Sequence, residues 1–431
     1  MCSPLKPTAN LLNFFIIIGG FPLIPQDETW TKFKFWKRAF VPHVITYGLP
    51  IVLYISSLVI IFNGGHSFQE FKNHWYSYEL NLMDLIAFIV LIWVHILVTL
   101  IILIIFRNAA KPISGLCQSM AEHNQLLDIS EKDLKPLTKQ TYLALLFLFI
   151  LHILSVLSSY RYCSDLLAQE LNQYLNFPMH IIWISIVFIF FWPFPNATSF
   201  IVNRQCLLTL DHQLLVYNSR ISSEKVEEKD EDSVKIRIEE HNPEFFIEVG
   251  YKIRASLDAA SDTLGSFLFI DVCMCVFVTI ISVYFIPLIF EAFSLSEDTS
   301  DIVVNNVKLS YGLHCLFLAI KASVRWINFY RVGQKIALKC HKISFSLEHL
   351  LMEHQTSMPK YLRRNLKILI QRYKTNSPIR PWNSFDLNLS TAISAAGLVS
   401  TYLVILIQFR QSSQECLECP FFGNITEKMI H

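Results

Sequence analysis

The side chains that could do chemistry in this chain are polar groups placed within long apolar runs. Asp271, Lys321 and Arg325 each interrupt such a run. A charge in apolar surroundings is costly unless it has a partner, so residues of this kind form ion pairs or serve a functional site. Asp271 and Arg325 fall at comparable depth in their runs. We therefore expect them to pair and to fix helix packing, without a role in ligand binding.

Catalytic signatures are absent from the sequence. It contains no phosphate-binding glycine loop, no HExxH helix and no nucleophile elbow. His349 and His354 lack the i, i+4 spacing of a zinc-binding pair, so we expect them on a solvated helix face. No enzyme activity, metal or cofactor is expected. The net charge of +1 gives no electrostatic basis for a nucleic-acid partner.

Hydrogen-bonding and aromatic side chains gather in the outer halves of four apolar runs. Aromatic walls with a few hydrogen-bonding groups are what a small-molecule pocket needs. For each residue alone, helix packing or an interfacial aromatic belt is the simpler interpretation. Their convergence from several helices predicts a ligand site that contains His152, Ser155, His180, Trp183, Tyr284, Tyr311 and His314.

The last apolar run, 389–409, is rich in small and hydroxyl residues in its first half. Small residues allow helices to approach closely. Steps of three or four residues place one stripe on a helix, made of Ser394, Leu398, Thr401, Ile405, Gln408 and Phe409. Several copies around an axis would make this stripe a pore, narrowed by Ile405 and closed at its outer edge by Gln408 and Phe409. A single buried helix in a monomeric bundle fits the same pattern.

Seven membrane-spanning helices are the elements that must position these groups. The chain is 53% hydrophobic and 16% charged, whereas a soluble domain carries about 25% charged residues. Roughly 20 apolar residues cross a bilayer as a helix. The qualifying stretches are 40–62, 85–106, 142–160, 179–202, 266–290, 309–330 and 389–409. The fold is therefore predicted to be an all-α membrane protein.

Basic residues indicate the orientation of these helices. Most of the 36 Lys and Arg residues lie in the N-terminal segment and in the second, fourth and sixth connections. The positive-inside rule places these segments in the cytoplasm, so the N-terminus is predicted to be cytoplasmic and the C-terminus extracellular. The predicted regions are a cytoplasmic segment (1–39), helices 1–6 with cytoplasmic extensions (40–330, with a long intracellular loop at 204–265), cytoplasmic helices (331–388), the seventh helix (389–409) and an extracellular tail (410–431).

Two of these regions carry further expectations. In the tail, Asn424 begins a glycosylation sequon. Cys416 and Cys419 share the predicted external side with Cys163, where either a disulfide or unpaired thiols are expected. In the cytoplasmic region, 360–374 is a basic amphipathic helix, with one side lined by Tyr361, Leu362, Leu366, Leu369 and Ile370. This side would lie on anionic lipid or in a subunit interface, and we favour the interface.

The last apolar run contains a motif that resembles the signature of a known protein family. Thr401-Tyr402, five apolar residues and Gln408-Phe409 are similar to the closing signature of the insect gustatory receptors. Chain length, seven spans and a cytoplasmic N-terminus agree with this resemblance. It implies a tetrameric ligand-gated cation channel, related to the insect olfactory receptors. In such a channel the cytoplasmic extensions form an anchor domain, Ile405, Gln408 and Phe409 form the constriction, and the ligand site lies in the outer bundle.

The resemblance also implies a function and a location. It implies a tastant-gated, non-selective cation channel in the plasma membrane of gustatory neurons, either a homotetramer or a heterotetramer with related receptors. Leu403 replaces the acidic residue that the main sugar-receptor branch carries, which favours bitter or plant-derived ligands. A fructose-type receptor remains an alternative. The residues alone also leave open an inverted seven-helix metabotropic receptor, a small-solute transporter, or a non-sensory homologue.

Overall fold

The computed structural model describes residues 82–171, 193–223, 243–294, 299–354, 356–375 and 378–418. Within these ranges the chain forms helices and no strand, which confirms the predicted all-α class. The elements are α5 (Leu82–Leu126), α6 (Glu131–Leu171), α8 (Pro193–Ser223), α9 (Pro243–Tyr284), α10 (Pro287–Ser294), α11 (Thr299–Glu353), α12 (Lys360–Thr375), the 3₁₀ turn η4 (Pro381–Asn383) and α13 (Leu389–Glu418).

Four helices in the described ranges are long and apolar enough to cross a membrane: Glu131–Ser158, Pro243–Phe293, Val304–Glu353 and Leu389–Arg410. They contain the spans predicted at 266–290, 309–330 and 389–409, and all but the last two residues of the span predicted at 142–160. The predicted span 85–106 falls in α5. The span 40–62 and most of 179–202 lie outside the described residues, as do the segment 1–39 and Asn424.

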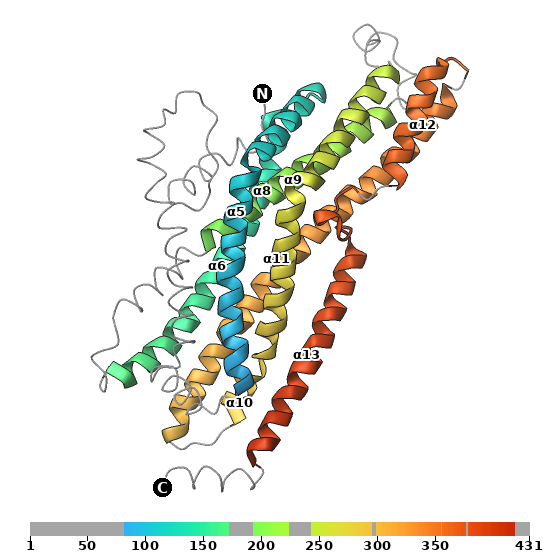
Figure 1. Ribbon diagram of the computed structural model, residues 1–431. Coiled ribbons are helices and arrows are strands. Elements are labelled where there is room, and N and C mark those ends of the chain that lie inside the picture. The colour runs from blue at the N-terminus through green and yellow to red at the C-terminus, as the bar shows by residue number, and fades with distance from the viewer. Residues whose placement is uncertain are drawn as a thin grey trace.

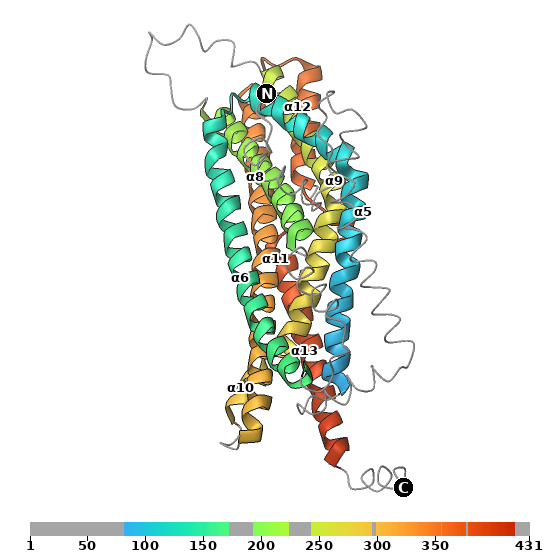
Figure 2. The ribbon, with the colours of Figure 1, turned by 90° about the vertical axis from the view of Figure 1, so that its left-hand side faces the viewer.

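The helices run side by side along one long axis (Figures 1 and 2). α11 is central, because it contacts α6, α8, α9, α10, α12 and α13. The turn from α5 to α6, the end of α8 and α12 lie at one end of the bundle, here called the α12 end. The start of α5, α10 and the end of α13 lie at the other, the α10 end. Charge patterning predicts that the α12 end is cytoplasmic and the α10 end extracellular.

Prolines mark the start of three helices, and the length of α11 shows that it extends beyond a membrane. α8, α9 and α10 each begin at a proline, a residue that suits the first helical position because its missing N–H would be unbonded there. α11 has 55 residues, which at 1.5 Å per residue is about 80 Å. A bilayer core is about 30 Å thick, so α11 must extend well beyond it. The part of α11 after residue 330 forms the first of the cytoplasmic helices predicted at 331–388.

The chain reverses direction between α11 and α12, and it then continues through η4 into α13 towards the α10 end (Figure 1). Trp382 and Asn383 both adopt positive φ angles, which closes a tight turn. A Cβ on Gly265 would lie 2.9 Å from the backbone nitrogen of Trp382, and a Cβ on Gly333 would lie 2.1 Å from the carbonyl oxygen of Leu387. Two glycines therefore let α9 and α11 approach the segment that leads into α13.

Candidate functional site

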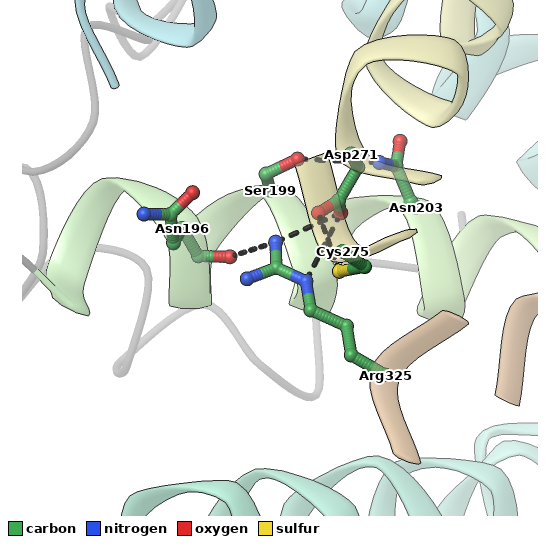
Figure 3. A network of polar contacts seen from close by, with 6 residues as sticks. All are labelled: Asn196, Ser199, Asn203, Asp271, Cys275 and Arg325. Carbon is green, nitrogen blue, oxygen red and sulfur yellow. Dashed lines mark hydrogen bonds and ion pairs between the residues drawn. The ribbon is translucent and has the colours of Figure 1, made fainter. Parts of the chain in front are cut away.

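A buried ion pair joins α9 and α11 in the centre of the bundle. Arg325 donates from Nε and from a terminal nitrogen to Asp271 Oδ2, at 3.1 and 2.8 Å. The same terminal nitrogen also donates to the carbonyl oxygen of Asn196 on α8, at 2.7 Å. Figure 3 shows these contacts, with Cys275 Sγ 3.9 Å from the other oxygen of Asp271. The structure thus brings together the two residues expected to pair, and the pair ties three helices to one another.

A second cation lies one helical turn from Arg325 and faces α6. Lys321 Nζ is 3.2 Å from His152 Nδ1. Within the described ranges, Lys321 forms no ion pair with a carboxylate. His152 was expected in the ligand site, whereas Lys321 was not. The spacing of Lys321 and Arg325 could have suggested that the two cations share a helix face, but only the packing of α6 against α11 shows which residue Lys321 meets.

The other described residues of the expected ligand site form a connected group. His314 Nδ1 lies 2.9 Å from both the hydroxyl and the carbonyl oxygen of Ser155. The His314 ring stacks on Tyr311 at 6.3 Å, and Tyr311 meets Phe285 edge-on at 4.9 Å. Phe285 in turn meets the Tyr284 ring at 4.9 Å.

These side chains are packed inside the bundle rather than spread over an open surface. Ser155, Tyr284 and Tyr311 are 1%, 1% and 4% exposed. Residues from α6, α9 and α11 therefore converge, as the sequence suggested, and a ligand that reaches them must displace parts of this packing. His180 and Trp183 lie outside the described residues.

A charged cluster at the α10 end was not foreseen from the sequence. Tyr284 donates its hydroxyl to Asp84 Oδ1 at 2.8 Å. Arg410 Nε lies 3.6 Å from the same oxygen, and an Arg410 terminal nitrogen lies 2.9 Å from Glu291 Oε1. Arg410 had been assigned to the extracellular tail, but it belongs to α13 and is only 8% exposed. Two features of the sequence could have suggested this cluster. Asp84 directly precedes the apolar run 85–106, and Arg410 directly follows the run 389–409.

The expected pore stripe lies along α13. Ser394 and Thr401 are exposed and donate their hydroxyls to carbonyl oxygens of their own helix, at 3.2 and 3.0 Å. Ile405 and Phe409 are 40% and 57% exposed, and Gln408 is also exposed. In its most apolar stretch, only 6% of α13 is buried inside the chain. Among the described residues, the spanning part of α13 is thus the least buried of the four apolar spans. Cys416 lies near its end, and Cys419 is outside the described residues.

The amphipathic helix α12 differs from its expected role. Leu362, Leu366, Leu369 and Ile370 are buried, and α12 contacts α9 and α11 of the same chain. Its apolar face is thus covered within one subunit, and neither lipid nor a second subunit is needed to cover it. Only Tyr361, at 58% exposure, remains outside.

Buried tyrosines complete this packing at the α12 end. Tyr217 donates to the carbonyl oxygen of Phe246 at 2.7 Å, and Tyr373 donates to that of Gly250 at 3.0 Å. Burial raises the pKa of both phenols above the usual value, so both act as neutral donors. In the same region, burial lowers the pKa of His123, whose Nδ1 lies 3.1 Å from Ser256 Oγ.

Comparison with known proteins gives a family and a fold. A family model described as 7tm chemosensory receptor matches residues 10–413. The structure is similar to that of the insect olfactory receptor OR5 from Machilis hrabei in complex with eugenol, with 14% identity, 94% of this chain and 98% of that chain covered, and a TM-score of 0.62. A second structure of OR5 covers the same shares, with 12% identity and a TM-score of 0.61. No curated protein matches the chain. At these identities the solved structures show a shared fold.

Proposed function

Because the chain belongs to the 7tm chemosensory receptor family, we propose that it is a gustatory receptor that acts as a tastant-gated, non-selective cation channel. It is a membrane-spanning receptor and not an enzyme. The Thr401–Phe409 signature favours a gustatory over an olfactory role. The proposed location is the plasma membrane of gustatory neurons.

The observation that carries this proposal is the contrast between α6 and α13. Both present much of their surface outside the described chain, but between residues 142 and 157 the exposed residues of α6 are apolar or aromatic, such as Leu143, Phe147 and Ile150. Lipid tails can cover such a face. The exposed surface of α13 includes Thr401 and Gln408, and polar groups within a membrane face protein or water. In an assembly of several copies around an axis, this face of α13 would meet both neighbouring protein and the water of a central pore.

We propose four copies, in a homotetramer or in a heterotetramer with related receptors. Ser394 and Thr401 would line the pore, and Ile405, Gln408 and Phe409 would form its constriction. An apolar constriction of this kind can stop ions by excluding water. Extensions of α8, α9 and α11 together with α12 would form the anchor domain, held at its centre by the intrachain packing of α12.

The proposed ligand is a small molecule that enters the bundle among α6, α9 and α11. The site would contain His152, Ser155, Tyr284, Tyr311 and His314, with His180 and Trp183 as further members. Aromatic rings and imidazoles suit a largely apolar compound with a few hydrogen-bonding groups. The eugenol complex of OR5 shows a compound of this kind bound to the same fold. Together with Leu403, this favours bitter or plant-derived tastants over sugars.

The test is patch recording and calcium imaging of the chain in cells, with quinine, caffeine, denatonium, eugenol and fructose as probes. G-protein signalling is blocked with a non-hydrolysable GDP analogue. We expect unitary cation currents that survive the block, and an altered permeability sequence in Gln408→Ala. Leu403→Val, on the half-buried side of α13, serves as the matched control and should leave permeability unchanged. Responses that vanish under the block, or saturable uptake without unitary events, would overturn the proposal.

A further inference from the structure

The charged cluster at the α10 end joins the end of α13 to three other helices. Asp84 lies on α5, Tyr284 on α9, Glu291 on α10 and Arg410 on α13. Arg410 reaches Asp84 and Glu291, and the Tyr284 hydroxyl shares the Asp84 oxygen that Arg410 approaches. The Arg410 guanidinium also lies over the Tyr284 ring, 5.9 Å from its centre. One side chain of α13 therefore meets all three neighbours.

Two members of this cluster are buried, so their charges need a partner of opposite charge. The side chains of Asp84 and Arg410 are 1% and 9% exposed, whereas that of Glu291 is 37% exposed. Removal of one partner from a buried ion pair leaves a charge without compensation. The end of α13 can therefore separate from α5 only if the charges of Asp84 and Arg410 find other partners. Since Arg410 directly follows Phe409, this restraint acts next to the proposed gate.

A continuous series of ring contacts leads from the cluster into the bundle. Tyr284 meets Phe285, and Phe285 meets Tyr311, with ring centres 4.9 Å apart in both pairs. Tyr311 stacks on His314, which is hydrogen-bonded to Ser155 on α6. Tyr284, Phe285 and Tyr311 are each at most 4% exposed. In close-packed surroundings a shift of one ring must displace the next.

We propose that Arg410 is a positioning residue that couples the packing around Tyr311 and His314 to the position of Gln408 and Phe409. This proposal rests on the proposed function, because it takes Gln408 and Phe409 as the gate. A molecule that displaces Tyr311 moves Phe285 and Tyr284. Movement of Tyr284 disturbs its hydrogen bond to Asp84, and the Asp84–Arg410 contact passes the change to α13. Arg410 acts through its neighbours and touches neither the ligand nor the permeating ion.

The test is a double-mutant cycle that needs neither a ligand nor a current. Gln408→Cys is introduced into the full chain, and its rate of modification by a membrane-impermeant methanethiosulfonate reagent is measured on intact cells. We expect Tyr311→Leu to change this rate by at least about fivefold when Arg410 is present, and by less than about twofold in the Arg410→Gln background. Tyr284→Phe, which removes only the hydroxyl, should weaken the effect of Tyr311→Leu in the same direction.

Two further variants separate coupling from loss of folding. Arg410→Lys keeps the charge and should retain more of the coupling than Arg410→Gln. Arg331→Gln removes an exposed cation from the half of α11 that leads to the α12 end and should leave the rates unchanged. Surface amount and melting temperature are measured for each protein. Additive effects of Tyr311→Leu and Arg410→Gln would overturn the coupling even if the wild type conducts. A wild type without unitary currents would overturn the channel proposal, whatever the modification rates are.

Discussion

The core formed by α8, α9 and α11 and the outlying helix α13 treat their polar groups in opposite ways. In the core, Asp271 and Arg325 are buried and bond to each other and to the backbone of α8. Along α13, Ser394, Thr401 and Gln408 are exposed although they lie in a span apolar enough to cross a membrane. In the most apolar stretches, 56% of the α9–α10 span is buried against 6% of α13.

The contrast separates a region that is packed by contacts within the described chain from a region that those contacts leave exposed. The core pairs the charges of Asp271 and Arg325 internally, so its stability should depend on contacts within the chain. The exposed face of α13 makes few contacts with the other parts of the chain that the structure describes. In the proposed channel, water and neighbouring copies would meet this face. This contrast predicts that substitutions in the two regions will have different consequences.

The largest effect should follow from breaking the core ion pair. Asp271→Asn leaves Arg325 buried without a full counter-charge, and such a change costs about 3–5 kcal/mol. We expect a lower melting temperature in detergent and a reduced amount at the cell surface, measured by fluorescence-detected size exclusion. The double variant Asp271→Asn, Arg325→Gln should lose less than either single variant. If Asp271→Asn melts like the wild type, the core does not depend on this pair.

A smaller loss should come from Gly333→Ala, at the junction between α11 and the segment before α13. The added Cβ would lie 2.1 Å from the Leu387 carbonyl oxygen, and overpacking of this kind costs about 1–3 kcal/mol. Gly397→Ala is the matched control, because an added Cβ there meets nothing within 4 Å in the chain. Thermal melting of both variants checks the prediction. A large loss in Gly397→Ala alone would indicate that another copy packs on this face.

Thr401→Leu should separate stability from permeation. Thr401 is exposed on α13, so we expect a change in unfolding free energy within about 0.5 kcal/mol. Single-channel conductance should fall, because a hydroxyl in the proposed pore is replaced by a larger apolar group. Melting and single-channel recording are made on the same preparation. A melting change as large as that of Asp271→Asn would remove the contrast between α13 and the core.

The smallest effect should be a pH dependence at the α12 end. Burial lowers the pKa of His123 below its ordinary value of 6.5. The unfolded chain therefore binds more protons than the folded chain below that value, and stability is lost as the pH falls from about 6.5 towards the lowered pKa. Melting temperatures are compared between about pH 7.5 and pH 5.5 for the wild type and His123→Gln. An unchanged pH dependence in the variant would contradict this assignment.

Much of the core was predictable from local information. Apolar runs of about the length of a bilayer predicted the core spans at 266–290 and 309–330, and also the spans at 142–160 in α6 and 389–409 in α13. The Asp271–Arg325 contact followed from comparable depth in two neighbouring spans. A charge in an apolar run has few ways to be compensated, so depth alone restricted its choice of partner.

The cluster around Arg410 was not predictable in the same way. Asp84, Tyr284 and Arg410 are far apart in sequence and come together only through the packing of α5, α9 and α13. The apolar face of α12 shows the same limit. Its helical period was evident in Leu362, Leu366 and Leu369, but the period does not say whether lipid, another subunit or the same chain covers the face. The structure shows that α9 and α11 cover it.

The sequence by itself determined the class of fold, the approximate position of these spans and the unusual polarity of the last helix. Hydrophobicity and helical period are local properties, and they suffice for these conclusions. Apart from the Asp271–Arg325 pair, the partners of the buried polar groups became evident only from the tertiary packing. It joined His314 to Ser155, Lys321 to His152, and Arg410 to Asp84 and Glu291. These contacts depend on the rotation and depth of each helix against its neighbours, which are set by side-chain packing over the whole bundle.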